Sequence, residues 1–115
     1  MSSDALPTHF TLHTGAQIPT VGFGTWQAPN DVVEQAVFEA LTCGYRHIDC
    51  ASIYRNETGV GAGIRKSGVN RKDIFITGKL WNTKHLPSDV EGALDKTLAD
   101  LGVEYLDLFL MHWPV

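Results

Sequence analysis

The sequence predicts an α/β fold and, within that class, the N-terminal half of a (β/α)8 TIM barrel. Segments with strand character alternate with helical segments of about 10–15 residues, which is typical of right-handed βαβ units that build a parallel sheet. No helix follows the last predicted strand, although parallel sheets are covered by helices. Residues 1–115 are therefore expected to open a larger barrel domain, and a four-stranded flavodoxin-like sheet is the alternative.

The first third of the chain is predicted to contain a hairpin, a strand and a helix. Residues 9–19 (HFTLHTGAQIP) place two short strand-like stretches on either side of a glycine turn, which predicts the hairpin. Residues 21–24 (VGFG) form a short glycine-rich strand. The helix that follows is expected to start at a capping box formed by Asp31 and Glu34 and to stop at Gly44, because apolar side chains recur at helical spacing between these points.

The middle of the chain repeats the pattern of strand, helix and strand. Residues 45–49 read as a strand that leads into a helix over about 56–66, and Gly68 ends that helix. Residues 73–80 (DIFITGKL) are mostly apolar and predict a buried strand.

One more helix and one more strand complete the predicted order. Ser88 and Glu91 are expected to form a second capping box, and an apolar stripe then continues to a stop at Gly102. Residues 104–111 (EYLDLFLM) are the last predicted strand.

The composition excludes several classes of partner. The chain has 9 Lys and Arg against 13 Asp and Glu, for a net charge of −4, and its basic residues are scattered, which argues against nucleic-acid binding. No apolar run approaches the roughly 20 residues of a membrane span, and the N-terminus does not have the pattern of a secretory signal. Because Cys43 and Cys50 show no disulfide spacing, we expect a reduced, cytoplasmic protein.

Polar residues stand at the predicted carboxyl ends of the strands. Gly24-Thr25-Trp26, Asp49, Lys79 and His112 end the four strands in turn, with about 30 residues, or one βα unit, between successive positions. Parallel strands place their carboxyl ends at one rim, where barrels and open α/β sheets hold their active sites. The alternative is that each residue only marks the point where a strand meets solvent.

Tyr54 lies in the loop after Asp49 and is expected to fold back over this rim, unless it packs on the next helix. A phenol is a weak proton donor at neutral pH, and a neighbouring ammonium favours its ionised form. Lys79 could supply that charge, and Asp49 could keep Lys79 protonated and oriented. His112 could donate a hydrogen bond to a carbonyl oxygen and direct it toward Tyr54. These side chains therefore predict proton delivery to an oxygen that becomes an alkoxide.

The motifs around these positions resemble those of the aldo-keto reductases. The segment 44–51 (GYRHIDCA), with Glu57 and Gly61 at matching offsets, is similar to the first signature of that family. The resemblance extends over nearly the whole chain, through GFGTW at 22–26, YRNE at 54–57, KLW at 79–81 and LMHWP at 110–114. It is strongest to fungal glycerol dehydrogenase-like and xylose reductase-like members, which reduce small aldehydes with NADPH.

This resemblance implies a role for each rim residue. The implied catalytic residues are Tyr54, Lys79, Asp49 and His112, with Tyr54 as the proton donor. The implied contacts of NADP(H) are Gly24, Thr25 and Trp26 along its nicotinamide half, together with Asp49, Lys79 and His112. The implied substrate-binding residues are Trp26, Tyr54, Trp81, His112 and Trp113, although the tryptophans could instead be core residues.

The implied activity is NADPH-dependent reduction of small aldehydes or ketones, glyceraldehyde-like or aldose-like, and the reverse oxidation of polyols. A non-catalytic regulatory or structural subunit is the alternative, and the intact set of four polar residues argues against it. A third possibility is that the 115-residue piece acts by itself as an assembly fragment.

The sequence departs from the family pattern in two respects. Gly78 stands before the lysine where the family usually has Ser or Thr, although Lys79 stays in register. The second half of the barrel, which supplies the adenosine and 2′-phosphate contacts in the family, is absent. We expect Val115 to mark a nick or a gap in a long loop, with the C-terminal half of the same barrel as the partner.

Two other patterns are not expected to carry chemistry. His9 and His13 share a strand face but would lie about 13 Å apart, too far to bind one metal ion, so no metal is predicted. The glycines at 59, 61 and 63 do not have the strand-to-helix context of a phosphate-binding loop.

Overall fold

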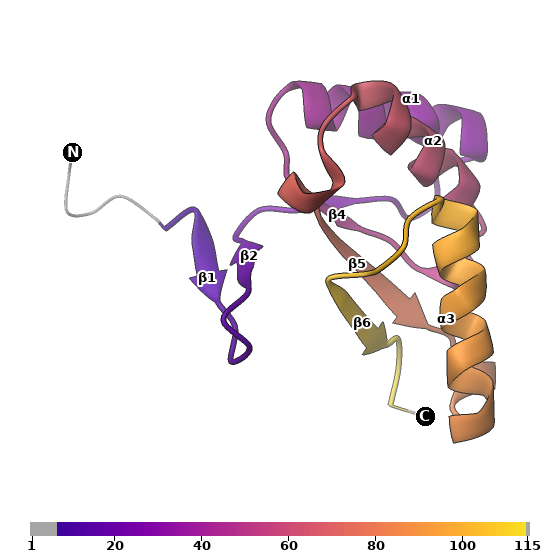
Figure 1. Cartoon of the computed structure of the whole chain (residues 1–115). Helices are drawn as coiled ribbons and strands as arrows, with labels where there is room; N and C mark the ends of the chain where they lie inside the picture. Colours follow the sequence, from indigo (N-terminus) through magenta and orange to yellow (C-terminus); the bar gives the residue numbers. More distant parts are fainter. Residues whose placement is uncertain (1–6, 115) are drawn as a thin grey trace.

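The expected alternation of strands and helices is present in residues 7–114, the part of the chain that the computed structural model describes (Figure 1). The strands are β1 (His9–Thr11), β2 (Gln17–Pro19), β3 (Phe23–Gly24), β4 (His47–Asp49), β5 (Phe75–Leu80) and β6 (Leu108–Met111). The α-helices are α1 (Asn30–Thr42), α2 (Glu57–Ser67) and α3 (Pro87–Leu101). Three short 3-10 helices lie in the connections: η1 (Ser52–Tyr54), η2 (Arg71–Asp73) and η3 (Asn82–Lys84).

The strand order decides between the two predicted architectures. β1 and β2 form a separate antiparallel hairpin, and the other four strands form a parallel sheet in the order β3-β4-β5-β6. A flavodoxin-like sheet would reverse direction at a switch point, whereas a barrel adds each new strand beside the last one. Figure 1 shows α1, α2 and α3 following one another along one side of this sheet. The arrangement is that of a barrel wall, and the flavodoxin-like alternative is wrong.

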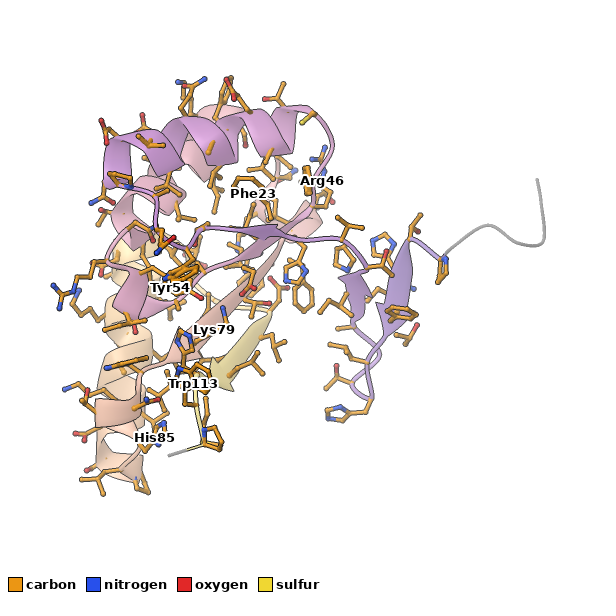
Figure 2. The ribbon with its side chains drawn as sticks, turned by 180° about the vertical axis from the view of Figure 1, so that it is seen from behind. Phe23, Arg46, Tyr54, Lys79, His85 and Trp113 are labelled. Atoms are coloured by element: carbon orange, nitrogen blue, oxygen red, sulfur yellow. The ribbon has the colours of Figure 1, made fainter. Side chains whose placement is uncertain are left out.

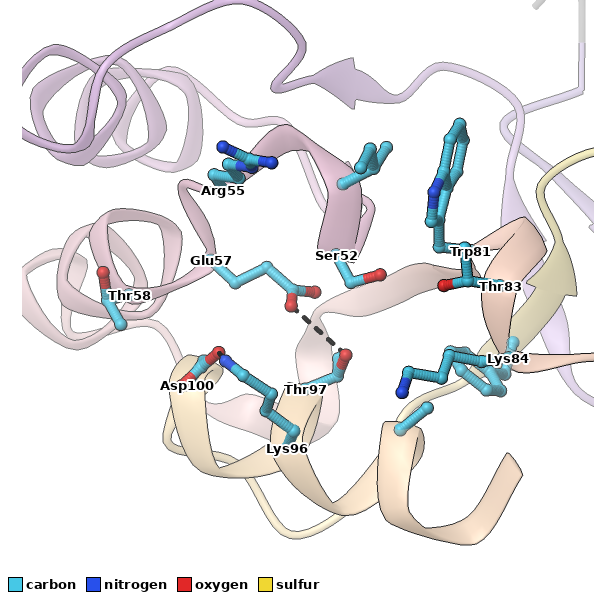
Figure 3. Close-up of a pocket in the computed structure, with 13 residues that line it drawn as sticks. Ser52, Arg55, Glu57, Thr58, Trp81, Thr83, Lys84, Lys96, Thr97 and Asp100 are labelled. Atoms are coloured by element: carbon cyan, nitrogen blue, oxygen red, sulfur yellow. Dashed lines mark hydrogen bonds and ion pairs between the residues drawn. The ribbon is translucent and has the colours of Figure 1, made fainter. Parts of the chain in front are cut away.

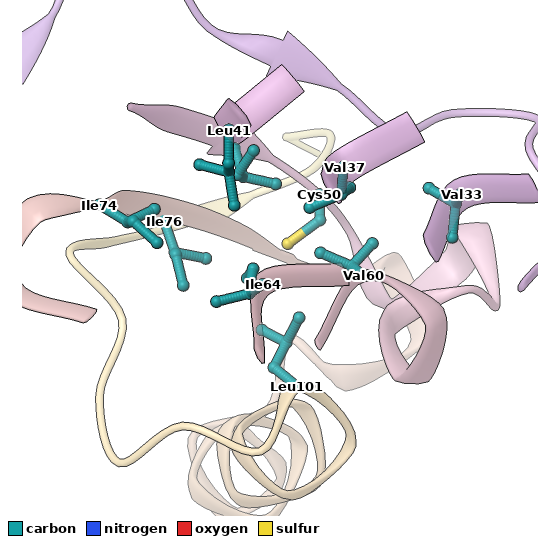
Figure 4. Packing of buried hydrophobic residues seen from close by; sticks show 10 residues of the cluster. Val33, Val37, Leu41, Cys50, Val60, Ile64, Ile74, Ile76 and Leu101 are labelled. Atoms are coloured by element: carbon teal, nitrogen blue, oxygen red, sulfur yellow. The ribbon is translucent and has the colours of Figure 1, made fainter. Parts of the chain in front are cut away.

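The hydrophobic core lies between the helices and the face of the sheet that they cover (Figure 4). Ile48 of β4 and Ile76 of β5 are fully buried, as are the residues of α1 that face them. The other core members are Val33, Val37, Leu41, Cys50, Val60, Ile64, Ile74 and Leu101. Because successive strand residues alternate between faces, burying Ile48 and Ile76 directs Asp49, Thr77 and Lys79 to the opposite face. Core packing thus sets which side chains are free for chemistry.

The three glycines of α2 let neighbouring helices approach closely. A Cβ at Gly59 would overlap the Asn30 carbonyl at the start of α1, and one at Gly63 would lie 2.9 Å from Cβ of Val37. On the other side of α2, a Cβ at Gly61 would overlap the Leu101 carbonyl at the end of α3. These glycines are therefore packing residues, which agrees with the expectation that they do not form a phosphate-binding loop.

Both predicted capping boxes are wrong. The N-caps of α1 and α3 are Pro29 and Leu86, and neither helix start has a side-chain capping bond. At α1 the Asn30 side chain instead accepts hydrogen bonds from the Gly59 backbone and the Thr58 hydroxyl, so it ties α1 to α2. At α3 a proline occupies the first turn, where its missing N–H costs nothing. The stops at Gly68 and Gly102 are confirmed, since both take the left-handed conformation.

The last strand is shorter than predicted, because β6 begins at Leu108. The Arg71 guanidinium donates to the Tyr105 carbonyl and, at 2.8 Å, to the Asp107 carboxylate, which also accepts from the backbone N–H of Ile76. The backbone before Leu108 is held by these side chains and by one backbone bond, from the Asp107 N–H to the Ile76 carbonyl at 3.0 Å, and is not part of the strand. Within the described helices, none combines the length and the apolar character needed to cross a membrane.

Candidate active site

The structure brings Asp49, Tyr54, Lys79 and His112 together at the carboxyl end of the sheet. Figure 2 shows Tyr54 and Lys79 near one another. Asp49 is the last residue of β4, and Lys79 is the penultimate residue of β5. Tyr54 ends the η1 turn that follows β4. The backbone N–H of His112 donates to the Leu80 carbonyl at 3.0 Å, which continues the β5–β6 pairing past the end of β6. Sheet register therefore places residues that are distant in the sequence at one edge.

The ammonium of Lys79 is the centre of the site. Its Nζ donates to Oδ1 of Asp49 at 2.5 Å and to the Cys50 carbonyl at 3.2 Å. It also lies 3.5 Å from the Tyr54 hydroxyl and 5.3 Å from the centre of the Tyr54 ring. The Lys79 side chain is 14% exposed, so these contacts are only partly screened by water. The predicted contact of aspartate, lysine and tyrosine is present in the folded chain.

Burial and the neighbouring charge act in opposite directions on Lys79. Burial by itself lowers the pKa of Lys79, whereas the hydrogen bond and the negative charge of Asp49 raise it, with a further contribution from Tyr54. The net effect raises the pKa of Lys79 above its ordinary value. Lys79 is therefore a permanent positive charge beside the Tyr54 hydroxyl at physiological pH.

His112 is held in the site by aromatic rings. Its imidazole packs edge-to-face against Tyr54 and Trp81, with ring centres 5.7 and 5.4 Å away, and it stacks on Trp113 at 6.2 Å. Burial, followed by the charge of Lys79, lowers the pKa of His112, which favours the neutral ring. A neutral imidazole can donate one hydrogen bond without adding a second positive charge to the site.

The three tryptophans differ in their contacts. Trp81 and Trp113 both contact the imidazole of His112, whereas Trp26 makes no ring contact with another aromatic residue in the described part of the chain. Trp26 lies in the connection between β3 and α1 and is 67% exposed. The structure thus places two of the predicted substrate-binding tryptophans beside the rim and leaves the third on a separate loop.

In the predicted cofactor segment, residues 24–26, the polar groups of Thr25 are used within the protein, whereas Gly24 borders open space. Thr25 is buried, and both its backbone N–H and its hydroxyl donate to the Asp49 carbonyl, at 3.2 and 3.3 Å. Gly24 pairs with Asp49 in the sheet, and a Cβ added at Gly24 would meet nothing within 4 Å. The open space beside Gly24 adjoins the Asp49 end of the rim.

Two nearby side chains have structural roles. The Nε2 atom of His47 pairs with the Thr77 hydroxyl at 2.9 Å, so this histidine is satisfied within the sheet. The thiol of Cys50 donates to the Thr77 carbonyl at 3.1 Å, and burial raises its pKa, which suppresses the reactive thiolate. Within residues 7–114, no group of three or more His, Cys, Asp or Glu side chains is placed to hold a metal ion.

Asn56 and Glu57 are two buried polar residues to which sequence reasoning gave no role. Asn56 is 1% exposed and Glu57 is 5% exposed, although both residue types are normally at the surface. The signal available in the sequence was their place in the YRNE motif directly after Tyr54. Their burial depends on the packing of α2 against its neighbours, which a local pattern does not reveal.

The carboxyl rim of this parallel barrel wall carries a tyrosine, a lysine and an aspartate in contact, with a histidine beside the tyrosine. The sequence model of the Aldo/keto reductase family matches residues 20–115. The chain belongs to the Aldo/keto reductase family, and the resemblance seen in its motifs is confirmed.

Curated relatives agree with this assignment. D/L-glyceraldehyde reductase of Hypocrea jecorina is 58% identical over 110 residues, which are 91% of this chain and 33% of that protein. Aldo-keto reductase family 1 member A1 of Mus musculus is 56% identical over 108 residues, which are 90% of this chain and 33% of that protein. The chain thus spans about a third of the length of these relatives.

Solved structures confirm the fold. An aldo/keto reductase from Brucella melitensis superposes with a TM-score of 0.91 at 47% identity, covering 98% of this chain and 44% of that one. An aldo-keto reductase from Bombyx mori, solved in complex with NADP, gives a TM-score of 0.89 at 41% identity and covers 93% of this chain and 38% of that one. The described residues therefore have the fold of the N-terminal part of the family's (β/α)8 barrel.

Proposed function

We propose that this chain is the N-terminal half of an NADP(H)-dependent aldo-keto reductase that reduces small aldehydes or ketones to alcohols and catalyses the reverse oxidation of polyols. Glyceraldehyde-like and aldose-like compounds are the proposed substrates, in keeping with the D/L-glyceraldehyde reductase among the relatives. The contact of Lys79 Nζ with both Asp49 Oδ1 and the Tyr54 hydroxyl is the observation that carries the proposal.

The residues of this chain fit the reactive half of a nicotinamide cofactor. Gly24 leaves open space beside Asp49, and the backbone of residues 24–26 borders it. We assign the nicotinamide half to this segment together with Asp49, Lys79 and His112. NADPH supplies a hydride to the carbonyl carbon when bound. The NADP complex of the Bombyx mori relative supports this cofactor, and the adenosine contacts are assigned to the C-terminal half of the barrel.

Tyr54 is the proposed proton donor. Its hydroxyl gives a proton to the carbonyl oxygen as negative charge develops there, and the Lys79 ammonium, 3.5 Å away, stabilises the phenolate that remains. Asp49 keeps Lys79 protonated and directed at Tyr54 through the 2.5 Å hydrogen bond. The neutral imidazole of His112 donates a hydrogen bond to the same carbonyl oxygen and orients it toward Tyr54.

Aromatic side chains form the proposed substrate pocket. Trp81 and Trp113 pack against His112, and we assign them to the wall beside the carbonyl oxygen. Trp26, on the exposed loop after β3, is assigned to the same pocket. The other half of the same barrel is the proposed partner of this chain, because the face of the sheet opposite the helices carries half-buried and exposed apolar side chains such as Leu108 and Leu110. The free thiols Cys43 and Cys50 support a cytoplasmic location.

Replacing Tyr54 in the complete protein tests the proposal. Tyr54→Phe keeps the ring and removes only the hydroxyl, so kcat for DL-glyceraldehyde reduction is expected to fall by at least about 100-fold while NADPH affinity is retained. Tyr105→Phe is the matched control, since the Tyr105 ring packs under Arg71 away from the rim. A Tyr54→Phe enzyme with more than about a tenth of wild-type turnover would remove Tyr54 as the donor. Absence of NADPH consumption by the complete wild-type protein would instead favour the regulatory or structural alternative.

A further inference from the structure

We propose that Asn56 is a positioning residue that holds the turn over residues 25–28 and thereby sets the place of Trp26 in the substrate pocket. The role of Trp26 rests on the proposed function, whereas the contact between Asn56 and the turn is present in the structure. The inference assigns to this buried amide the control of KM and of substrate choice, distinct from the proton chemistry of Tyr54.

The side-chain amide of Asn56 bridges the two ends of the turn. Its Nδ2 donates to the Thr25 carbonyl at 2.6 Å and to the Ala28 carbonyl at 2.9 Å. Both protons of the amide are used, and the residue is 1% exposed, so no water competes for these bonds. Only an NH2 group can satisfy two carbonyl oxygens in this way, because a carboxylate in the same place has no proton to donate.

The bridged turn contains a residue in an uncommon backbone conformation. Gln27 has φ of 68°, a left-handed conformation that side-chain-bearing residues rarely adopt and that neighbouring contacts must maintain. Thr25 is fixed on one side of Gln27 by its hydrogen bonds to Asp49. On the other side, the Asn56 amide is the side-chain contact that fixes the Ala28 carbonyl.

Trp26 depends on this backbone because little else fixes it. The residue is 67% exposed and stands in sequence between Thr25 and Ala28, the two residues whose carbonyls Asn56 binds. The φ and ψ angles of the turn set the direction of the Cα–Cβ bond of Trp26. Fixing the turn therefore fixes the point from which the indole extends and limits the region that it can reach.

The same amide connects the tryptophan loop to the tyrosine segment. Asn56 lies two residues after Tyr54, and the residue between them, Arg55, has φ of 57°. Gln27 and Arg55 are the only non-glycine residues with positive φ in residues 7–114, and the Asn56 hydrogen bonds join their two turns. Uncommon backbone conformations persist only where surrounding contacts hold them, and they are frequent in ligand-binding segments. The amide thus ties the turn over residues 25–28 to the start of α2.

A double-mutant cycle in the complete protein tests this coupling. Asn56→Ala is expected to raise KM for glyceraldehyde on the order of tenfold or more, because misplacing one pocket wall weakens substrate binding, and to leave kcat within about threefold. In a Trp26→Ala background the same substitution is expected to have little further effect on KM, since the group that Asn56 positions is gone. Equal effects of Asn56→Ala in both backgrounds, or an unchanged KM, would overturn the proposal.

Thr58→Val is the matched control. The Thr58 hydroxyl also joins the first turn of α2 to the start of α1, through Asn30 at 3.0 Å, but it does not touch residues 25–28. This variant is expected to leave KM unchanged, and an effect equal to that of Asn56→Ala would show that any loosening of α2 is sufficient. If Asn56→Ala does not fold, Asn56→Ser replaces it, because serine keeps one hydrogen-bond donor. The KM of Asn56→Ser is expected to lie between those of wild type and Trp26→Ala. A wild-type KM in Asn56→Ser would contradict the proposal.

A measurement that does not depend on activity separates this inference from the proposed function. Amide hydrogen exchange of a peptide covering residues 22–29, followed by mass spectrometry, is expected to be faster in Asn56→Ala and unchanged in Thr58→Val. Unchanged exchange in Asn56→Ala would refute the positioning role even if the protein is an active reductase. If exchange is faster in Asn56→Ala but the complete protein has no reductase activity, the positioning role of Asn56 is supported and the proposed function is rejected.

Discussion

Replacing Glu57 with glutamine is expected to remove a large part of the pH dependence of stability. Glu57 is the first residue of α2, is 5% exposed, and points into the cavity between α2 and α3 (Figure 3). Its Oε1 accepts a hydrogen bond from the Thr97 hydroxyl at 3.2 Å, and its Oε2 is buried with no hydrogen-bond partner among the described residues. Burial raises the pKa of Glu57 from 4.5 to about 7, and Thr97 offsets only part of that effect.

The magnitude follows from proton linkage. Between pH 4.5 and about pH 7 the folded protein holds a proton on Glu57 that the unfolded chain has released, so the free energy of unfolding falls as the pH rises through this window. Each pKa unit corresponds to about 1.4 kcal/mol, so the full effect is about 3 kcal/mol, most of which falls between pH 5 and pH 8. The stabilisation is complete below the unfolded pKa and is lost above the folded one.

Urea denaturation of the complete protein at pH 5 and pH 8 measures this difference. Glu57→Gln imitates the protonated acid at every pH, so the loss of stability between the two pH values is expected to shrink by roughly 2–3 kcal/mol relative to wild type. The control Glu91→Gln, at an exposed position on α3, is expected to lose as much stability between pH 5 and pH 8 as wild type. Identical pH dependence in wild type and Glu57→Gln would refute the assignment of the buried charge.

Two further predictions concern the rim and the open barrel. Asp49→Asn removes the carboxylate that raises the pKa of Lys79, so burial is expected to lower that pKa. The alkaline decline of kcat/KM should then begin at a lower pH than in wild type. An unchanged pH profile would contradict the pairing of Asp49 with Lys79. Residues 1–115 alone expose Leu110 and Met111 of the edge strand β6, so by gel filtration they are expected to associate and by fluorescence not to bind NADPH, until the C-terminal half is added. A monomeric fragment that binds NADPH tightly would refute the half-barrel interpretation.

Several features of the protein could be predicted from the sequence by itself. The order of strands and helices follows from local apolar spacing, and the stops at Gly68 and Gly102 follow from the tolerance of glycine for the left-handed conformation. The rim residues could be predicted because each comes at a strand end and parallel strands align those ends. These signals are all contained within a single element or in the spacing between elements.

Only the tertiary structure shows how residues in different elements use one another. Asp31 and Glu34 are predicted to cap α1, but the side chain there that bonds another element is Asn30, which accepts from α2. Of the predicted substrate-binding tryptophans, Trp81 and Trp113 contact the His112 ring, whereas Trp26 lies on a separate loop. The Asn56 side chain bonds Thr25 and Ala28, which lie 31 and 28 positions before it in the sequence. The bond between Glu57 and Thr97 joins residues that are 40 positions apart. Such contacts depend on how closely α2 packs against the sheet and against its neighbouring helices. That distance is set by the whole core, including three glycines, and no local pattern determines it.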